Sequence, residues 1–351
     1  MKRYLQVIGL FIMLALALAG CGSQGTGSNG NSSSGPITLN LAYYPNITHA
    51  VALVGVARGT FQQELGSKVK LSSKIFNAGP AEIEALFAGD IDIGYVGPSP
   101  AVNGFVQSHG QALRIIAGAA SGGVSLIVRP AANIHTAKDL SGKKVADPQL
   151  GGTQDVSLRY YLKENGLAPQ DKGGTVQIVP TDNSTTLTLF KEGKIDAAWV
   201  PEPYATRLVV EDGGTRFIDE RTLWPGGVFS TTEVIVRTAF LNAHPDIVNK
   251  FLQAHVDTIQ YIQSNPTQAA TYVNNELIQI TGKGLKSSEI TEALNYLTIT
   301  YDPLTASVQM QADRAYALGF LKSTPDLTGI YYLGPLNQVL TSKGLATVSG
   351  S

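Results

Sequence analysis

Residues able to bind a small charged molecule gather on short loops of this chain, at residues 44–49, 77–80, 97–100 and 151–154. Each loop precedes or opens an expected helix and carries hydroxyl, amide or glycine residues. The first turn of a helix leaves backbone N–H groups unpaired and carries a partial positive charge. Several such turns facing one cleft would form an anion site without any arginine.

Individual residues on these loops offer particular donors. Gly152 lets the backbone approach a ligand closely, and Thr153 adds a hydroxyl group. Ser99 could donate a second hydroxyl from another loop. Thr153 and Ser99 could equally be plain helix N-caps, in which the hydroxyl oxygen accepts from the first turn. Considered together, however, the four loops favour one ligand-binding cleft to which all of them contribute.

Glu202 is the most informative charge, because it lies between Pro201 and Pro203 in a loop that follows an expected strand. If its carboxylate points into the cleft, it would accept from an ammonium or hydroxyl group of a ligand, or pair with Arg207. A solvated loop glutamate is an equal alternative.

Ring side chains supply a different kind of contact. Trp224 lies in a loop rich in proline and glycine, where its ring could close over the apolar part of a ligand, and Tyr44 could do the same. His49 also lies on the first loop and is a candidate contact, although a neutral hydrogen bond to the backbone is favoured.

Signatures of enzymes and of nucleic-acid binders are weak. The five histidines are scattered without the spacing of a metal site, so no metal and no cofactor are expected. Residues 97–101 lack the glycine pattern of a nucleophile elbow. The formal net charge is −1, which excludes the basic surface that nucleic acids require.

The start of the chain reads as an export signal. Residues 1–20 place Lys2 and Arg3 before an apolar run and small residues, which is typical of a secretory signal peptide. Cys21, the only cysteine, follows in a pattern that resembles the lipobox of bacterial lipoproteins, whose thiol carries diacylglycerol; an ordinary signal with a free thiol is the alternative. Residues 21–35 are polar and uncharged, as in a flexible linker. We therefore expect an extracytoplasmic protein held at the cell membrane by a lipid anchor only.

Alternating strand and helix patterns follow, which favour an α/β fold. Residues 89–101 and 193–205 match in constant register, each with Gly-x-Ile-Asp, an aromatic residue, Val and a final Ala. Chance similarity is the alternative, but two lobes of similar build are favoured. We expect residues 36–122 to form the first part of lobe 1, 123–232 to form lobe 2, and 233–351 to form a mostly helical second part of lobe 1.

Several stretches together resemble the substrate-binding proteins of ABC importers for nitrate, sulfonates and taurine. They are Tyr-Tyr-Pro-Asn-Ile-Thr-His-Ala at 43–50, Asn-Ala-Gly-Pro at 77–80, Gly-Asp-Ile-Asp-Ile-Gly-Tyr-Val-Gly-Pro-Ser-Pro-Ala at 89–101, Gly-Gly-Thr-Gln at 151–154 and Trp-Val-Pro-Glu-Pro-Tyr-Ala at 199–205. The resemblance implies a two-lobe periplasmic-binding-protein type II fold with a cleft between the lobes. It also implies ligand contacts at Tyr44, Asn46, His49, Gly79, Ser99, Thr153, Gln154 and Glu202.

The function that this resemblance implies is solute capture without catalysis. We expect a monomer that binds a small organic anion, an aliphatic sulfonate or taurine, and delivers it to an ABC permease in the membrane. Nitrate or a thiamine-precursor nitrogen heterocycle is the alternative ligand. An enzyme of pyrimidine biosynthesis is the alternative from another class; it should need a cofactor and a catalytic histidine.

Overall fold

The computed structural model describes residues 35–350. The expected signal peptide (residues 1–20), the lipid-carrying Cys21 and all but the last residue of the linker lie outside the described residues. Among the helices of residues 35–350, none combines the length and the apolar character that a membrane crossing requires.

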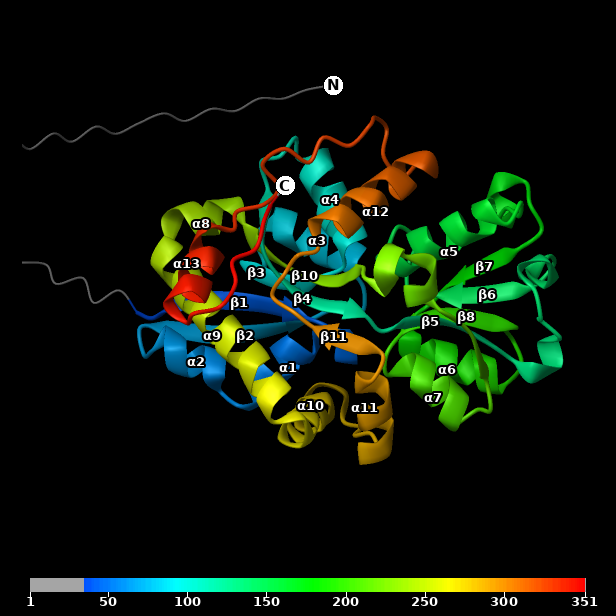
Figure 1. Cartoon of the computed structure of the whole chain (residues 1–351), viewed down its shortest axis with the longest axis horizontal. Coiled ribbons are helices and arrows are strands. Elements are labelled where there is room, and N and C mark those ends of the chain that lie inside the picture. Colours follow the sequence, from blue (N-terminus) through cyan, green and yellow to red (C-terminus); the bar gives the residue numbers. More distant parts are fainter. Residues whose placement is uncertain (1–34, 351) are drawn as a thin grey trace, which may run out of the picture. The chain divides into compact units, whose positions relative to one another are not determined.

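Two mixed β-sheets organise the described chain (Figure 1). The six-stranded sheet runs β11-β4-β10-β3-β1-β2, with β1 parallel to β2 and β3, and β10 antiparallel to β3 and β4. Its strands are β1 (Ile37–Tyr43), β2 (Val69–Ile75), β3 (Ile93–Val96), β4 (Leu113–Gly122), β10 (Ser230–Arg237) and β11 (Leu297–Ile299).

The five-stranded sheet repeats this plan in the order β7-β6-β8-β5-β9, with β6 parallel to β7 and β8, and β5 antiparallel to β8 and β9. Its strands are β5 (Val124–Val128), β6 (Lys144–Asp147), β7 (Gln177–Pro180), β8 (Ala197–Pro201) and β9 (Thr215–Asp219). We call the first sheet with its helices the first lobe, and the second sheet with its helices the second lobe.

The sequence repeat has a structural cause. Its two copies place β3 and β8 at equivalent positions, each between a parallel and an antiparallel neighbour. In the first copy Asp92 accepts a hydrogen bond from the Asn40 N–H at 2.9 Å, and in the second Asp196 accepts one from the Lys144 N–H at 2.9 Å. Each aspartate therefore ties its strand to the central parallel strand of its own sheet.

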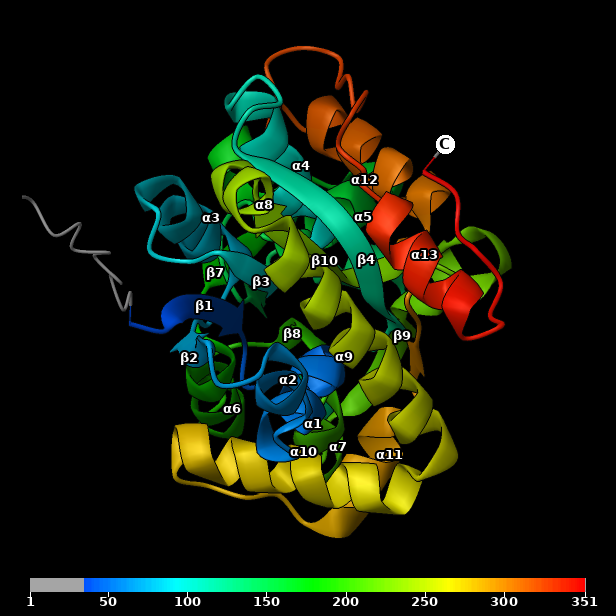
Figure 2. The same cartoon turned by 90° about the vertical axis from the view of Figure 1, so that its left-hand side faces the viewer.

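Helices cover both faces of each sheet (Figures 1 and 2). One face of the first sheet packs on α1 (Ala50–Ala57), α2 (Thr60–Leu65), α8 (Thr238–Ala243), α9 (Pro245–Ser264), α10 (Pro266–Thr281), α11 (Ser287–Leu294) and α13 (Gly334–Ser342). The other face packs on α3 (Gly79–Ala88), α4 (Pro98–Gln107) and α12 (Thr305–Ala317). The second sheet lies between α5 (Thr153–Glu164) on one face and α6 (Asn183–Lys191) and α7 (Tyr204–Val210) on the other.

Short 3₁₀ helices join these elements. They are η1 (Ile47–His49), η2 (Pro130–Ala132), η3 (Ala137–Leu140), η4 (Gln170–Lys172), η5 (Glu220–Leu223) and η6 (Pro225–Gly227).

The passage between the lobes needs glycine. The chain leaves the first sheet at the end of β4 and enters the second at Val124 through Gly122 and Gly123, which have φ angles of 77° and 75°. A Cβ on Gly123 would also lie 2.2 Å from the side chain of Leu297. Residues with a side chain rarely adopt this left-handed backbone, so glycine lets the chain turn from one sheet to the next.

Candidate ligand-binding site

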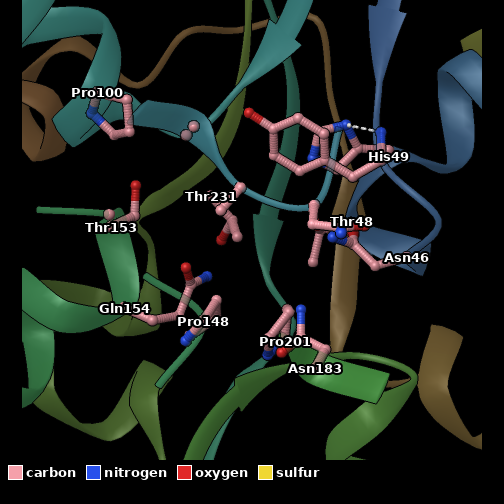
Figure 3. A pocket seen from close by; sticks show the side chains of 16 residues that line it. Asn46, Thr48, His49, Pro100, Pro148, Thr153, Gln154, Asn183, Pro201 and Thr231 are labelled. Carbon is pink, nitrogen blue, oxygen red and sulfur yellow. Dashed lines mark hydrogen bonds between the residues drawn. The ribbon is translucent and has the colours of Figure 1, made fainter. Parts of the chain in front are cut away.

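A narrow pocket lies between the two lobes, with about 410 Å³ of unfilled space that includes its opening to solvent (Figure 3). Both copies of the repeat contribute to it, through Gly97 and Pro100 in the first lobe and Pro201 in the second. Its other lining residues are Tyr44, Asn46, Thr48, His49, Asn77, Ala78, Gly79, Pro148, Gly152, Thr153, Gln154, Asn183 and Thr231. The pocket thus lies near the ends of β1, β3, β6 and β8.

None of the described side chains that line the pocket carries a formal charge at neutral pH, and many of them are polar. They include asparagine, threonine, glutamine and tyrosine, with no arginine, lysine, aspartate or glutamate among them. His49 is uncharged as well, because burial lowers its pKa to about 3. Any net attraction for a charged ligand must therefore come from backbone dipoles and hydrogen-bond donors.

Four helices begin at this pocket. Gly79 opens α3, Gly97 is the N-cap of α4, Gly152 is the N-cap of α5, and Asn183 opens α6. None of these N-termini is capped by a side-chain hydrogen bond from its N-cap residue. Their first-turn N–H groups and partial positive charges therefore stay available to an anion.

Two buried polar side chains at the pocket have an atom without a partner. Thr153 is 4% exposed and its Oγ1 makes no hydrogen bond; Asn183 is 7% exposed and its Oδ1 makes none. Because buried polar atoms are nearly always hydrogen-bonded, such atoms in a pocket indicate a ligand or water site. The expected N-cap role of Thr153 is not observed, since Gly152 occupies that position and Thr153 is the first residue of the helix.

Tyr44 and His49 form one wall. Their rings lie 4.1 Å apart between centroids, and the Tyr44 N–H donates to His49 Nδ1 at 3.3 Å (Figure 3). The Tyr44 hydroxyl donates to Oε2 of Glu82 in the first turn of α3. Burial raises the pKa of Glu82 to about 8, so this carboxyl is mostly protonated at neutral pH.

Hydrogen bonds join the lobes next to the pocket. The Ile47 N–H donates to the Glu202 carbonyl at 2.9 Å, and the Tyr204 hydroxyl donates to the Pro45 carbonyl at 3.2 Å. Both tie the first loop to the end of β8 and the start of α7. The structure therefore shows the lobes in contact around the site.

Most of the residues singled out in the sequence line this pocket. They are Tyr44, Asn46, His49, Gly79, Gly152, Thr153 and Gln154. Ser99, Glu202 and Trp224 are not among the lining residues. The Ser99 hydroxyl instead donates to Oε1 of Gln311 at 3.0 Å, which joins α4 to α12.

Glu202 is buried in the second lobe, and its carboxylate does not face the pocket. One oxygen lies 2.8 Å from Nη2 of Arg216, and the other accepts from the Thr206 N–H at 3.0 Å. Burial raises the pKa of Glu202, and the nearby Arg216 charge opposes that rise. The alternative pairing with Arg207 is also wrong, because Arg207 binds Glu211 at 2.6 Å.

Trp224 is 5% exposed and packs inside the second lobe rather than over a ligand. Its ring stacks on Phe229 with centroids 5.1 Å apart, and the Arg314 guanidinium lies 3.7 Å from its centroid. Its indole N–H donates to Glu220 at 3.2 Å. Trp199 donates to the same carboxylate at 2.7 Å, so both tryptophans belong to the core of this lobe.

Sequence reasoning did not single out Asn183, Asn77, Thr48 or Thr231. Asn77 and Thr48 lie on loops that it did identify. The sequence does indicate a helix start at Asn183, because residues 181–184 read Thr-Asp-Asn-Ser, a pattern typical of the first residues of a helix that follows a strand. The loop after β7 corresponds to residues 77–80 after β2, so the repeat also pointed to it.

The described residues contain no cluster of three histidine, cysteine, aspartate or glutamate side chains that could hold a metal ion.

Comparisons with known proteins found a matching family and several relatives. The model of the NMT1-like family matches residues 32–275. The taurine-binding periplasmic protein of Escherichia coli (strain K12) is 29% identical over 215 residues, which cover 61% of this chain and 64% of that protein. A putative aliphatic sulfonates-binding protein of Bacillus subtilis (strain 168) is 27% identical over 272 residues, or 75% of this chain and 76% of that protein.

Solved structures show the same architecture. The alkanesulfonate-binding protein SsuA from Xanthomonas axonopodis pv. citri, bound to MOPS, matches with a TM-score of 0.71 at 19% identity, over 86% of this chain and 100% of that chain. The likeness confirms the expected two-lobe periplasmic-binding-protein fold.

Proposed function

The chain belongs to the NMT1-like family, and from that premise we propose that it is an extracytoplasmic solute-binding protein that captures a small organic anion, an aliphatic sulfonate or taurine, for an ABC permease. The observation that carries the proposal is the convergence of four helix N-termini on one uncharged pocket. Such N-termini favour negative charge, and they do so without a cationic side chain.

A sulfonate fits this set of donors. Its charge is spread over three oxygens, each of which can accept more than one hydrogen bond, so it can take up N–H groups from several helix ends. The hydroxyl of Thr153 and an amide such as Gln154 add side-chain donors. The names of the taurine- and sulfonates-binding relatives support this choice over nitrate or a heterocycle.

Ligand capture would work by a shift between open and closed lobes. Residues 36–122 and 233–351 would form lobe 1 and residues 123–232 lobe 2. A ligand that contacts both lobes stabilises the closed form, which a permease then recognises. The contacts of Tyr204 and Ile47 across the lobes support a closed state of this kind.

The expected location of the protein and its non-catalytic role are part of the same proposal. Residues 1–20 and Cys21 support export and lipid anchoring at the cell membrane, on its outer face. A monomer would suffice, because one chain supplies the whole pocket. The relatives are named as binding proteins, which supports capture without turnover.

Titration calorimetry of the purified chain tests the proposal. The ligands are taurine, short alkanesulfonates, nitrate and an aminopyrimidine, and a sulfonate should bind with micromolar or tighter affinity. Binding of the aminopyrimidine alone, or chemical turnover of any of these compounds, would refute the proposal.

A further inference from the structure

The inner pocket continues into a wider outer groove. Tyr44, Asn46, Asn77 and Asn183 line both, so they form the boundary between the two spaces. The outer groove has about 1380 Å³ of unfilled space, including its opening to solvent. A ligand seated at the helix ends could therefore extend outward between the lobes.

Apolar side chains line much of the outer groove. Leu187 comes from α6, Leu277 and Ile280 come from α10, and Leu285 follows α10. The Tyr204 ring contributes from α7. These residues would shield a hydrocarbon body from water, which favours a ligand with several carbons.

Two carboxyl groups beside the pocket are held by other residues of the protein. Glu202 is held by Arg216 and the Thr206 N–H, and Glu82 accepts from the Tyr44 hydroxyl; both are fully buried and neither lines the pocket. Asp182 lines the outer groove, where two cations, Arg207 and Lys283, also lie. An ammonium group near the helix ends would thus have no lining carboxylate in the inner pocket.

This arrangement penalises one kind of sulfonate. In taurine the ammonium lies only two carbons from the sulfur, so a sulfonate held at the helix ends would place the ammonium close to their partial positive charges. A buried charge without a partner is strongly unfavourable. A hydroxyl at the same position is neutral and can both donate to and accept from the neighbouring amides.

We propose that the site selects sulfonates whose organic body is uncharged, with the body directed into the outer groove, and that it discriminates against the zwitterion taurine. This inference rests on the proposed function and names its substrate class more narrowly. The determinants are the uncharged inner lining and the sequestered carboxylates of Glu82 and Glu202.

The test compares two ligands of nearly equal shape, taurine and 2-hydroxyethanesulfonate, by calorimetry on the full chain. We expect the hydroxyl compound to bind at least about tenfold more tightly, and butanesulfonate to bind at least as well as ethanesulfonate. Equal or tighter binding of taurine would overturn the inference while leaving the proposed function intact. If no sulfonate binds, the proposed function and the inference both fail.

Two variants test the electrostatic cause. Asn77→Asp places a carboxylate at the boundary of the two spaces with little change in shape, and we expect the affinity ratio to move about tenfold toward taurine. Asp182→Asn removes the groove carboxylate, and any change in affinity should be the same for taurine as for 2-hydroxyethanesulfonate. A selective loss of taurine binding in Asp182→Asn would show that this residue meets the ammonium, which would overturn the inference.

Discussion

Gly97 and Thr153 meet where the two lobes approach each other, because a Cβ built on Gly97 would lie 2.2 Å from the hydroxyl oxygen of Thr153. Gly97 is the N-cap of α4 in the first lobe, and Thr153 begins α5 in the second. The φ angle of Gly97 is −68°, which any residue can adopt. Glycine is needed here for space between the lobes rather than for backbone freedom.

The first prediction follows from this close approach. Gly97→Ala should lower ligand affinity at least about tenfold, because the added methyl group holds the lobes apart in the closed form. Calorimetry with the best sulfonate measures the effect. Gly334→Ala is the matched control, since a Cβ there would have nothing within 4 Å. Unchanged affinity in Gly97→Ala would show that closure does not bring these two residues together.

The hydroxyl of Thr153 carries a second prediction. Thr153→Val keeps the shape of the side chain and removes an oxygen that has no protein partner, so we expect weaker binding by about 1–2 kcal/mol with little loss of stability. Thr232→Val is a close control, because Thr232 Oγ1 is also buried and unpartnered but does not line the pocket. Equal effects of both variants on affinity would argue against a ligand contact at Thr153.

Glu202 should matter for stability and not for ligand choice. Glu202→Gln weakens a buried ion pair with Arg216, whose loss should lower the free energy of unfolding by about 1–3 kcal/mol. The affinities for taurine and for neutral sulfonates should change by the same factor. Chemical denaturation and calorimetry on one preparation measure both quantities. A loss confined to taurine would place this carboxylate at the ligand after all.

Much of the fold could be predicted because its signals are local. The apolar spacing after Pro245 predicts the helix α9, and Ile247, Phe251, Ile259 and Ile262 are indeed buried on it. The repeat predicts two similar lobes, because each copy has the spacing of a helix end, a turn and a strand. Such patterns need only neighbouring residues, and the structure confirms them.

The site could be predicted only in part, for a physical reason. Thr153 and His49 were found because loops that follow strands and open helices must face the cleft. The prediction that Trp224 contacts a ligand was wrong. Phe229 and Glu220 are close to it in sequence, but Arg314, which covers its ring, comes from α12, far along the chain. The sequence does not show which distant residue packs on a charged or aromatic loop residue or pairs with it. Such a residue is therefore easily taken for a ligand contact.

The last prediction concerns the buried carboxyl of Glu82. Burial raises its pKa from an ordinary 4.5 to about 8, so between these values the folded chain holds a proton that the unfolded chain has lost. Its contribution to stability is therefore complete below about pH 4.5 and is lost as the pH rises toward 8. Glu82→Gln does not titrate and can still accept from the Tyr44 hydroxyl. Relative to the wild type, the variant should gain up to about 1.4 kcal/mol of stability per pH unit in this window.

Chemical denaturation at several pH values from 5 to 8 measures this difference between the two proteins. Glu84→Gln is the control for the loss of a carboxyl group from the same helix, because the Glu84 side chain is exposed. Other buried carboxyls, such as Glu233, also have a raised pKa, so only the difference between variant and wild type reports on Glu82. Parallel profiles for wild type and Glu82→Gln would mean that Glu82 is ionised in the folded protein, so that a buried negative charge would lie behind Tyr44.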